Sequence, residues 1–328
     1  ALREIMLTHD KIFVMGHKNP DADCVGAALG IYRLSKTLGK STYIVMDKDC
    51  PAIEPIVEGI YKERAEEEED IFVTNEEALL LKDKSAMLIV VDVNLPAMTE
   101  CPELLKSVST IVVLDHHRQN NETIKNAVVS YVEPYASSTC EMVAEILQYI
   151  VDKPKLKNIE ADAMYSGILV DTDNFVIKAG VRTFEAAAFL RRAGADVTRV
   201  RKMFREDMEH CRIRTAIINK AEIYMDEFAI STFDGANVSG ATVVGAKAAN
   251  ALLNIQGIRG SFVLTSLQDC IYISARSIDE LNVQVIMEKF NGGGHLTMAA
   301  AQLKNVTLEE AKQQLEDVLQ QMREDGDI

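Results

Sequence analysis

Basic residues, paired cysteines and long apolar runs are what this sequence has little of. Asp and Glu number 50 against 35 Lys and Arg, which gives a formal net charge of −15. Non-specific binding to long nucleic acid relies on a basic surface, so we do not expect it here. The six cysteines are scattered and form no CxxC pair. They predict reduced thiols of a cytosolic protein, because disulfide frameworks and zinc knuckles need paired spacings.

The sequence also has no segment of the kind that enters a membrane. No apolar stretch approaches the roughly 18 residues that span a bilayer, and no signal-peptide pattern is present. We therefore expect a cytoplasmic chain without direct membrane contact. Because the chain begins with Ala1 and not with Met, we keep a second expectation open, that it is the cytosolic part of a membrane-anchored parent protein.

The first half of the chain alternates between strand and helix patterns. Short apolar runs predict strands, and longer runs with helical spacing predict the helices between them. Ser138 precedes one of these helices with a capping box that ends at Glu141. Such alternation predicts an α/β fold with a doubly wound, mostly parallel sheet. The expected strands are residues 11–15, 42–45, 86–91 and 111–114, and the expected helices are residues 25–38, 138–150, 160–170 and 183–193.

The second half of the chain has a different order of elements. Residues 196–225 are rich in charge with helical spacing, and beyond them strand signals mix with helix signals in another sequence. At 328 residues the chain is long enough for two domains, each with its own core. We predict a metal-binding catalytic domain over 1–195, a helical connector over 196–225, and a smaller α/β substrate-binding domain over 226–328.

The sequence Asp115-His116-His117 directly follows the apolar run 111–114. In open α/β sheets the ligand crevice lies beyond the carboxyl ends of such strands. A single His at a strand end is more often a capped or solvated residue. An acid with two imidazoles favours metal or phosphoryl chemistry, provided that the rest of the chain supplies partners.

Three further strand or helix exits supply those partners. A His and two Asp follow the first strand, one Asp follows the strand at 86–91, and one follows the apolar run 168–170. Mixed oxygen and nitrogen donors suit hard or borderline divalent ions. Two Mn²⁺ that share Asp92 and Asp171 would use all the donors, with Mg²⁺ or Co²⁺ as lesser options; structural zinc is not expected, since thiolates are absent. The predicted ligands are His17, Asp21, Asp23, Asp92, His116 and Asp171.

A glycine-rich loop in the second half is the other candidate for function. Gly292, Gly293 and Gly294 precede His295, and glycines allow the backbone to approach an anion closely. A plain helix-to-strand turn explains the glycines equally well. Arg276 follows the strand signal at 271–275 and is able to hold a phosphate in bidentate fashion. Together these residues favour a phosphate or nucleotide clamp.

These motifs, in this order, resemble the DHH phosphoesterase superfamily with its DHH-associated C-terminal domain, and are most similar to the cyclic di-AMP phosphodiesterase branch. The stretches 131–138, 180–187 and 273–277 carry the same likeness, which spans nearly the whole chain. Members of that branch often carry this module at the end of a membrane-anchored protein with PAS-like and degenerate GGDEF domains. Departures are Asn94-Leu95, where relatives often show His-Arg, and Cys24, where Ser is usual.

The resemblance implies a division of labour among the candidate residues. His17 and Asp21 would hold one Mn²⁺ and Asp23 and His116 the other, and both ions would share the two bridging carboxylates. For catalysis it implies that Asp115 orients an imidazole and that His117 donates or shuttles a proton. Arg276 and the loop at 292–295 would hold the substrate.

The activity implied is hydrolysis of cyclic di-AMP to 5′-pApA by a metal-activated hydroxide, in a chain that we also expect to be a homodimer. The first alternative is a nanoRNase or 3′-phosphoadenosine-5′-phosphate phosphatase that acts on short linear nucleotides. The glycine loop speaks against a family II pyrophosphatase, and the acidic charge speaks against a RecJ-type exonuclease. A receptor that binds cyclic dinucleotides without hydrolysis is the alternative from another class.

Overall fold

The computed structural model describes residues 1–63, 70–278, 281–294 and 296–328, and the chain forms two compact units, Ala1–Arg205 and Glu206–Ile328. The boundary falls inside the segment that we expected to connect two domains. Helix α9 (Val197–Met203) belongs to the first unit, and helix α10 (Met208–Asn219) belongs to the second.

The first unit is built on a six-stranded sheet in the order β3-β2-β1-β4-β5-β6. Every neighbouring pair of strands is parallel. A parallel sheet of this order confirms the predicted fold class, and four of its strands lie where the apolar runs predicted them. The strands are β1 (Lys11–Met15), β2 (Ser41–Val45), β3 (Phe72–Val73), β4 (Ala86–Val91), β5 (Thr110–Asp115) and β6 (Val129–Val132).

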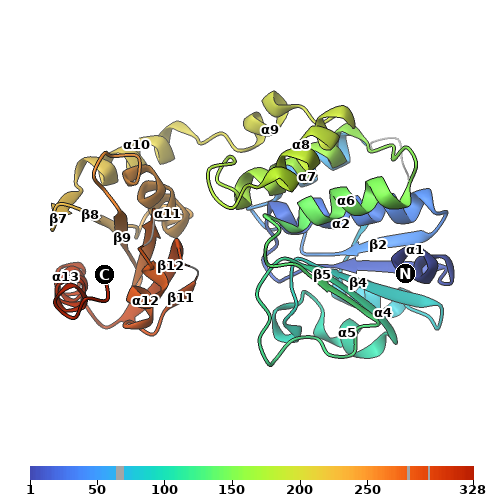
Figure 1. Ribbon diagram of the computed structural model, residues 1–328, viewed down its shortest axis with the longest axis horizontal. Helices are drawn as coiled ribbons and strands as arrows, with labels where there is room; N and C mark the ends of the chain where they lie inside the picture. The colour runs from blue at the N-terminus through green and yellow to red at the C-terminus, as the bar shows by residue number, and fades with distance from the viewer. Residues whose placement is uncertain (64–69, 279–280, 295) are drawn as a thin grey trace. The chain divides into compact units, whose positions relative to one another are not determined.

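Helices cover both faces of this sheet, as in other doubly wound folds (Figure 1). The side chains of β4 alternate between two apolar cores: Ile89 packs into one core, and Leu88 and Val90 pack into the other. Both faces of the strand are therefore buried. One side carries α2 (Ala22–Thr37), α6 (Thr139–Ile150), α7 (Asn158–Asp171) and α8 (Val181–Arg192), and the other carries α4 (Asn75–Leu81) and α5 (Pro102–Ser107); α1 (Leu2–Leu7), α3 (Glu54–Glu63) and the 3-10 helix η1 (Pro96–Met98) complete the unit.

Of the two hydrogen bonds of the capping box predicted at the start of α6, the structure has one. Ser138 is the N-cap, and its Oγ accepts a hydrogen bond from the Glu141 backbone N–H at 3.1 Å. The predicted return bond from the Glu141 side chain to the Ser138 backbone is wrong. Glu141 Oε2 instead accepts hydrogen bonds from the hydroxyls of Ser137 and Thr183, both at 2.6 Å. The bond from Thr183 ties α8 to α6 through this buried carboxylate. In a capping box the carboxylate would bond only to the end of its own helix.

The second unit has a mixed six-stranded sheet in the order β11-β12-β10-β9-β8-β7. Only β8 and β9 pair in parallel; the other neighbours are antiparallel. One face packs against α12 and α13 and the other against α10 and α11, which confirms a smaller α/β architecture. Its elements are β7 (Glu222–Tyr224), β8 (Phe228–Asp234), α11 (Ala241–Leu252), β9 (Gly260–Leu267), β10 (Cys270–Ser277), α12 (Val283–Glu288), β11 (Gly293–Gly294), β12 (Met298–Lys304) and α13 (Leu308–Glu324).

Candidate metal centre and substrate groove

Three neighbouring strands deliver ligand-type side chains to one edge of the first sheet. His17 lies two residues beyond β1, Asp92 directly follows β4, and His116 directly follows β5. These strands are adjacent in the sheet and parallel, so their carboxyl ends meet at the same edge. Asp92 adopts a left-handed backbone conformation with φ 60°, which is uncommon for a residue with a side chain and clusters at functional sites.

Two helices bring the remaining carboxylates to this edge. Asp21 is the N-cap of α2, and its Oδ1 accepts hydrogen bonds from the backbone N–H groups of Asp23 and Cys24, both at 3.0 Å. Asp23 is buried in the first turn of the same helix. Asp171 is the last residue of α7. The strand and helix exits recognised in the sequence therefore converge in space.

The six predicted ligands gather as two groups around Asp92. In the first group, His17 Nε2 lies 3.4 Å from Asp92 Oδ2 and 3.8 Å from Asp21 Oδ1. The ligand atoms of these three residues all lie within 4.8 Å of one another, close enough to surround one ion.

In the second group, His116 Nε2 lies 3.1 Å from Asp171 Oδ2 and 3.9 Å from Asp23 Oδ2. The same nitrogen lies 3.5 Å from Asp92 Oδ1. The two oxygens of Asp92 thus face two different imidazoles, and this carboxylate lies next to both groups. Asp171 makes its contact on the His116 side, and its predicted role as a second bridge stays a prediction.

His116 supplies the test of whether a cation fits this site. The side chain is 7% exposed, and its Nε2 atom has no hydrogen-bond partner of acceptable geometry in the described part of the chain. A buried polar atom without a partner is costly, and a bound cation would satisfy it. Carboxylate oxygens with two imidazoles suit Mn²⁺ or Mg²⁺, and none of the grouped side chains is a thiolate.

Burial and mutual repulsion perturb the carboxylates. Burial, and next the charge of Asp23, raise the pKa of Asp92 well above its usual range. The same two causes raise the pKa of Asp171 to about 6. The site thus holds more negative charge than its surroundings stabilise, and a divalent cation would relieve it.

The pKa values of the two imidazoles are also raised. Burial acts to lower the pKa of His17, but the nearby carboxylates of Asp21 and Asp92 outweigh it and raise that pKa to about 11. For His116 burial is likewise outweighed, chiefly by Asp171, and the pKa is raised to about 9. Near neutral pH and without a cation, both imidazoles therefore carry protons that a metal ion would displace.

Asp115 and His117 form a pair next to Asp92, and the ligand atoms of His117, Asp92 and His116 also lie within 4.8 Å of one another. Asp115 is fully buried, and its Oδ1 lies 2.8 Å from His117 Nδ1 and accepts the His117 backbone N–H at 3.2 Å. His117 Nδ1 is 3.7 Å from Asp92 Oδ1. Of the two imidazoles in the motif, the structure places Asp115 against His117.

Two residues that no sequence motif marks as site residues hold the carboxylates in place. Thr139, at the start of α6, donates its backbone N–H to Asp23 Oδ2 at 2.7 Å and its hydroxyl to Asp92 Oδ1 at 3.0 Å. Asn94 donates from Nδ2 to Asp115 Oδ2. The N-cap at Ser138 located the helix that begins with Thr139, but no local pattern tells which carboxylate that helix faces.

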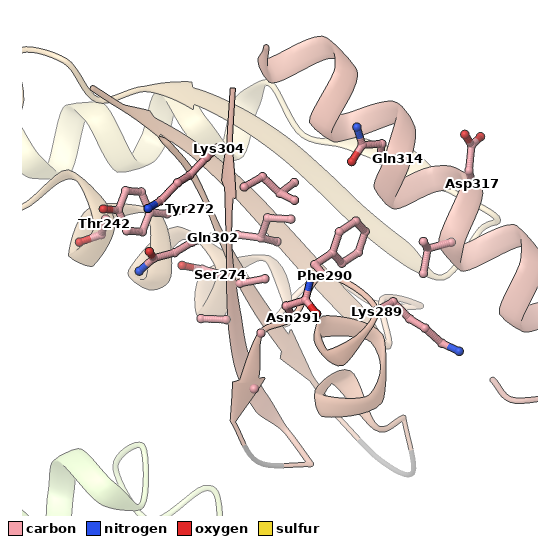
Figure 2. A pocket seen from close by; sticks show the side chains of 17 residues that line it. Thr242, Tyr272, Ser274, Lys289, Phe290, Asn291, Gln302, Lys304, Gln314 and Asp317 are labelled. Atoms are coloured by element: carbon pink, nitrogen blue, oxygen red, sulfur yellow. The ribbon is translucent and has the colours of Figure 1, made fainter. Parts of the chain in front are cut away.

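The predicted substrate residues of the second unit lie on the side of its sheet that β10, β11 and β12 form. Gly292 and Gly293 line a groove of about 1090 Å³ together with Tyr272 and Gln302 (Figure 2). The loop leads from α12 into β11, and Gly294 has φ 149°, a conformation that favours glycine. His295 lies outside the described residues.

Arg276, near the end of β10, is held in a defined orientation. Its Nε donates to Asn250 Oδ1 at 2.8 Å, and its Nη1 donates to the backbone oxygen of Ala275 at 2.9 Å. The side chain alternates onto the same face of β10 as Tyr272, one of the residues that line the groove.

Comparison with known proteins identifies the class that this fold and site define. Residues 11–168 match the DHH family, N-terminal domain, and residues 230–324 match the DHHA1 domain. The chain therefore carries a DHH family N-terminal domain followed by a DHHA1 domain, which confirms the resemblance carried by the motifs.

Individual relatives narrow the comparison. Cyclic-di-AMP phosphodiesterase PdeA from Listeria monocytogenes is 42% identical over 318 residues, covering 96% of this chain and 48% of the relative. The chain spans about half the length of the curated relatives that it matches first. In the described residues, no helix has the length and apolar character to cross a membrane.

Solved structures share the fold. An exopolyphosphatase-related protein from Bacteroides fragilis has a TM-score of 0.79 at 20% identity, covering 98% of this chain and 95% of that protein. Exonuclease RecJ bound to manganese has a TM-score of 0.50 at 16% identity, covering 96% of this chain and 93% of that protein.

Proposed function

We propose that this chain is a metal-dependent phosphodiesterase that hydrolyses cyclic di-AMP to linear 5′-pApA. The observation that carries the proposal is the position of Asp92, whose two carboxylate oxygens face the imidazoles of His17 and His116 at 3.4 and 3.5 Å. A carboxylate between two sets of donors would be able to serve two divalent ions at once. The substrate is proposed because a relative with 42% identity over 318 residues is a cyclic-di-AMP phosphodiesterase.

The proposed cofactor is a pair of Mn²⁺ ions. When bound, the ions supply a water that is nucleophilic near neutral pH and positive charge against the phosphate oxygens. His17 and Asp21 would hold one ion and Asp23 and His116 the other, with Asp92 between them. Asp171 is proposed as the second shared carboxylate. The manganese-bound structure of RecJ, which has the same fold, supports the choice of metal.

His117 is proposed to handle the proton of the leaving 3′ oxygen. Hydrogen bonding of Nδ1 to Asp115 at 2.8 Å fixes the plane of the ring and directs Nε2 to the opposite side. A ring that carries a proton on Nε2 as well as on Nδ1 is able to give the Nε2 proton to the alkoxide as the P–O bond breaks, and it keeps the Nδ1 proton on Asp115. Asp115 acts by holding the ring, because it is buried and makes its contacts with His117 and Asn94.

The second unit is proposed to bind the nucleotide. Arg276 offers a guanidinium to phosphate oxygens, and the loop at 292–295 offers backbone N–H groups. We also propose that the protein is a homodimer and that it acts in the cytoplasm, either by itself or as the cytosolic part of a membrane-anchored parent. Sedimentation of the purified chain tests the first of these, with a monomer at all concentrations as the contrary result.

Turnover of a substrate panel by wild type and Asp92→Ala tests the proposal. With Mn²⁺ we expect the wild type to prefer cyclic di-AMP over pApA, 3′-phosphoadenosine-5′-phosphate and cyclic di-GMP. Loss of the shared ligand should lower turnover by at least about a hundredfold, since even partners that only orient ligands are worth 10–100-fold. Asp269→Asn, at an exposed turn, is the matched control.

The panel also separates the alternatives. Preferred hydrolysis of the short linear substrates would favour the nanoRNase or phosphatase function. Binding of cyclic di-AMP in EDTA, followed by no turnover after Mn²⁺ is added, would favour a receptor. Activity of Asp92→Ala close to that of the wild type would rule out the two-metal scheme.

A further inference from the structure

We propose that Asn94 is a positioning residue for the reaction: it holds Asp115 in the orientation that keeps His117 Nδ1 bound to that carboxylate. The inference rests on the proposed phosphodiesterase function. Asn94 lies two residues beyond Asp92, in the segment between β4 and η1, and is 3% exposed. It belongs to none of the three groups of side chains that could hold a metal ion.

The orientation of the Asn94 carboxamide follows from its neighbours. Nδ2 donates to Asp115 Oδ2 at 2.5 Å and to the backbone oxygen of His117 at 3.3 Å. Both neighbours are acceptors, so only the NH₂ end of the amide is able to face them. Oδ1 points the other way and finds no hydrogen-bond donor within the described ranges of the chain. The arrangement thus satisfies the acceptors around His117 at the expense of one buried oxygen on Asn94.

The backbone of Asn94 is anchored independently of its side chain. Its carbonyl oxygen accepts the Ile124 backbone N–H at 2.9 Å, which ties the segment after β4 to the segment after β5. Removal of the side chain should therefore leave the path of the chain intact. This separation makes a side-chain substitution at Asn94 an informative test.

Asp115 depends on this donor because it is fully buried. Its Oδ1 is engaged by the backbone N–H and Nδ1 of His117, while Oδ2 receives Asn94. Without Asn94, Oδ2 would be a buried carboxylate oxygen without its donor, which is costly enough to drive the carboxylate to turn. A side chain such as Leu would leave it unsatisfied, and Asp would place a like charge against it.

Rotation of the Asp115 carboxylate matters because His117 Nδ1 has a second acceptor within reach. It lies 2.8 Å from Asp115 Oδ1 and 3.7 Å from Asp92 Oδ1. A ring nitrogen of His117 already lies within 4.8 Å of ligand atoms of Asp92 and His116. If Asp115 releases the ring, Nδ1 is therefore able to turn to Asp92 Oδ1. Asn94 therefore keeps the His117 ring bound to Asp115, where it is able to carry a proton, and away from the candidate metal ligand Asp92.

A double-mutant cycle on the Mn²⁺-loaded full chain tests the inference. Asn94→Ala should lower kcat by about 10- to 100-fold, the range for partners that orient a ligand, and leave KM within about twofold. Since Asn94 acts through Asp115, Asn94→Ala/Asp115→Asn should be no worse than Asp115→Asn alone. Asn75→Ala is the matched control, because its amide donates to Glu100 and touches neither residue. A kcat of Asn94→Ala within twofold of the wild type, or losses that multiply, would overturn the inference.

A measurement on metal-free protein separates this inference from the proposed function. Nitrogen-15 NMR of His117 in EDTA should show a proton fixed on Nδ1 in the wild type and in Asn75→Ala, and a mixture of tautomers in Asn94→Ala. An unchanged His117 spectrum in Asn94→Ala overturns the role of Asn94, whatever the enzyme hydrolyses. A changed spectrum supports that role. If the spectrum changes but the wild type hydrolyses none of the substrates, only the phosphodiesterase proposal fails. Thermal unfolding of each variant shows that the comparison is made between folded proteins.

Discussion

Gly167 of α7 lies directly against Asp23 of α2: a Cβ atom on Gly167 would lie 2.8 Å from Asp23 Oδ1 and 2.8 Å from its Cα. It would also lie 2.7 Å from the Sγ atom of Cys140 on α6. The missing side chain therefore lets three helices meet at one candidate metal ligand. At this meeting point, Asp23 reaches the backbone N–H groups that open α6.

Substitution of this glycine should impair metal binding beyond its effect on stability. Gly26→Ala is the matched control, since its Cβ would meet Cys140 Sγ at 2.6 Å and the backbone oxygen of Ala163 at 2.7 Å. Each change overpacks the same helices, and we expect a loss of about 1–3 kcal/mol in the free energy of unfolding. Only Gly167→Ala presses on Asp23, so it should also weaken Mn²⁺ binding, by about tenfold or more. Urea unfolding and calorimetric titration measure the two quantities; equal Mn²⁺ affinities would contradict the role of Gly167.

The sequence predicted the parts of the site that depend on regular strands. Each apolar run buried on both faces marks a parallel strand, and parallel strands share one carboxyl edge. His17, Asp92 and His116 could therefore be placed together from the sequence alone. Asp171 was located by the helix that it ends.

The remaining contacts were beyond sequence reasoning because they depend on how elements pack. Nothing in the local sequence around Thr139 or Asn94 marks either as a site residue. The Thr139 hydroxyl bonds to Asp92, 47 positions away, and the Asn94 amide bonds to Asp115, 21 positions away. The capping box at Ser138 failed for the same reason, since a tertiary contact with Thr183 captured the Glu141 side chain. Local propensity is overridden where a buried carboxylate finds better donors.

An ion pair between Arg33 of α2 and the buried Glu160 of α7 should control stability without touching the site. Arg33 donates from Nε and Nη2 to the two oxygens of Glu160, at 2.8 and 2.6 Å, and Glu160 is 3% exposed. Arg33→Leu leaves that carboxylate without its charged partner and should lower the free energy of unfolding by about 3 kcal/mol. Arg33→Leu/Glu160→Leu removes both charges and should recover much of the loss. Urea unfolding of the single and double variants decides; a double variant less stable than Arg33→Leu would contradict the argument.

Arg276 should contribute to substrate binding and leave the metal centre unchanged. We expect Arg276→Ala to raise KM for cyclic di-AMP by about 10- to 100-fold, since a hydrogen bond to a charged group contributes about 1.5–3 kcal/mol. Its Mn²⁺ affinity should equal that of the wild type. Asn250→Ala removes the side-chain acceptor that orients the guanidinium, and it should give a smaller change of the same kind. A wild-type KM in Arg276→Ala would exclude the residue from the substrate site.

Metal binding should be linked to pH through the shifted groups of the site. The raised pKa values of His116 and His17, about 9 and about 11, mean that both imidazoles carry protons at pH 7 in metal-free protein. An ion needs their lone pairs, so its binding must release protons. Calorimetry of Mn²⁺ binding in two buffers of different ionisation enthalpy measures that release, and equal enthalpies would show that no proton leaves.

The same shifts set the sign of the stability change. A histidine with a raised pKa stabilises the folded protein fully below its unfolded value near 6.5, and this stabilisation is lost as pH rises through about 9 for His116 and about 11 for His17. Asp171, with its pKa raised to about 6, adds stability in its protonated form at low pH, which is lost as pH rises through that value. Metal-free protein should therefore lose stability from pH 6 to pH 8, while Mn²⁺ binds more tightly over the same range. The rise in Tm on adding Mn²⁺ should accordingly be larger at pH 8 than at pH 6, and a rise that is constant or smaller at pH 8 would contradict this linkage.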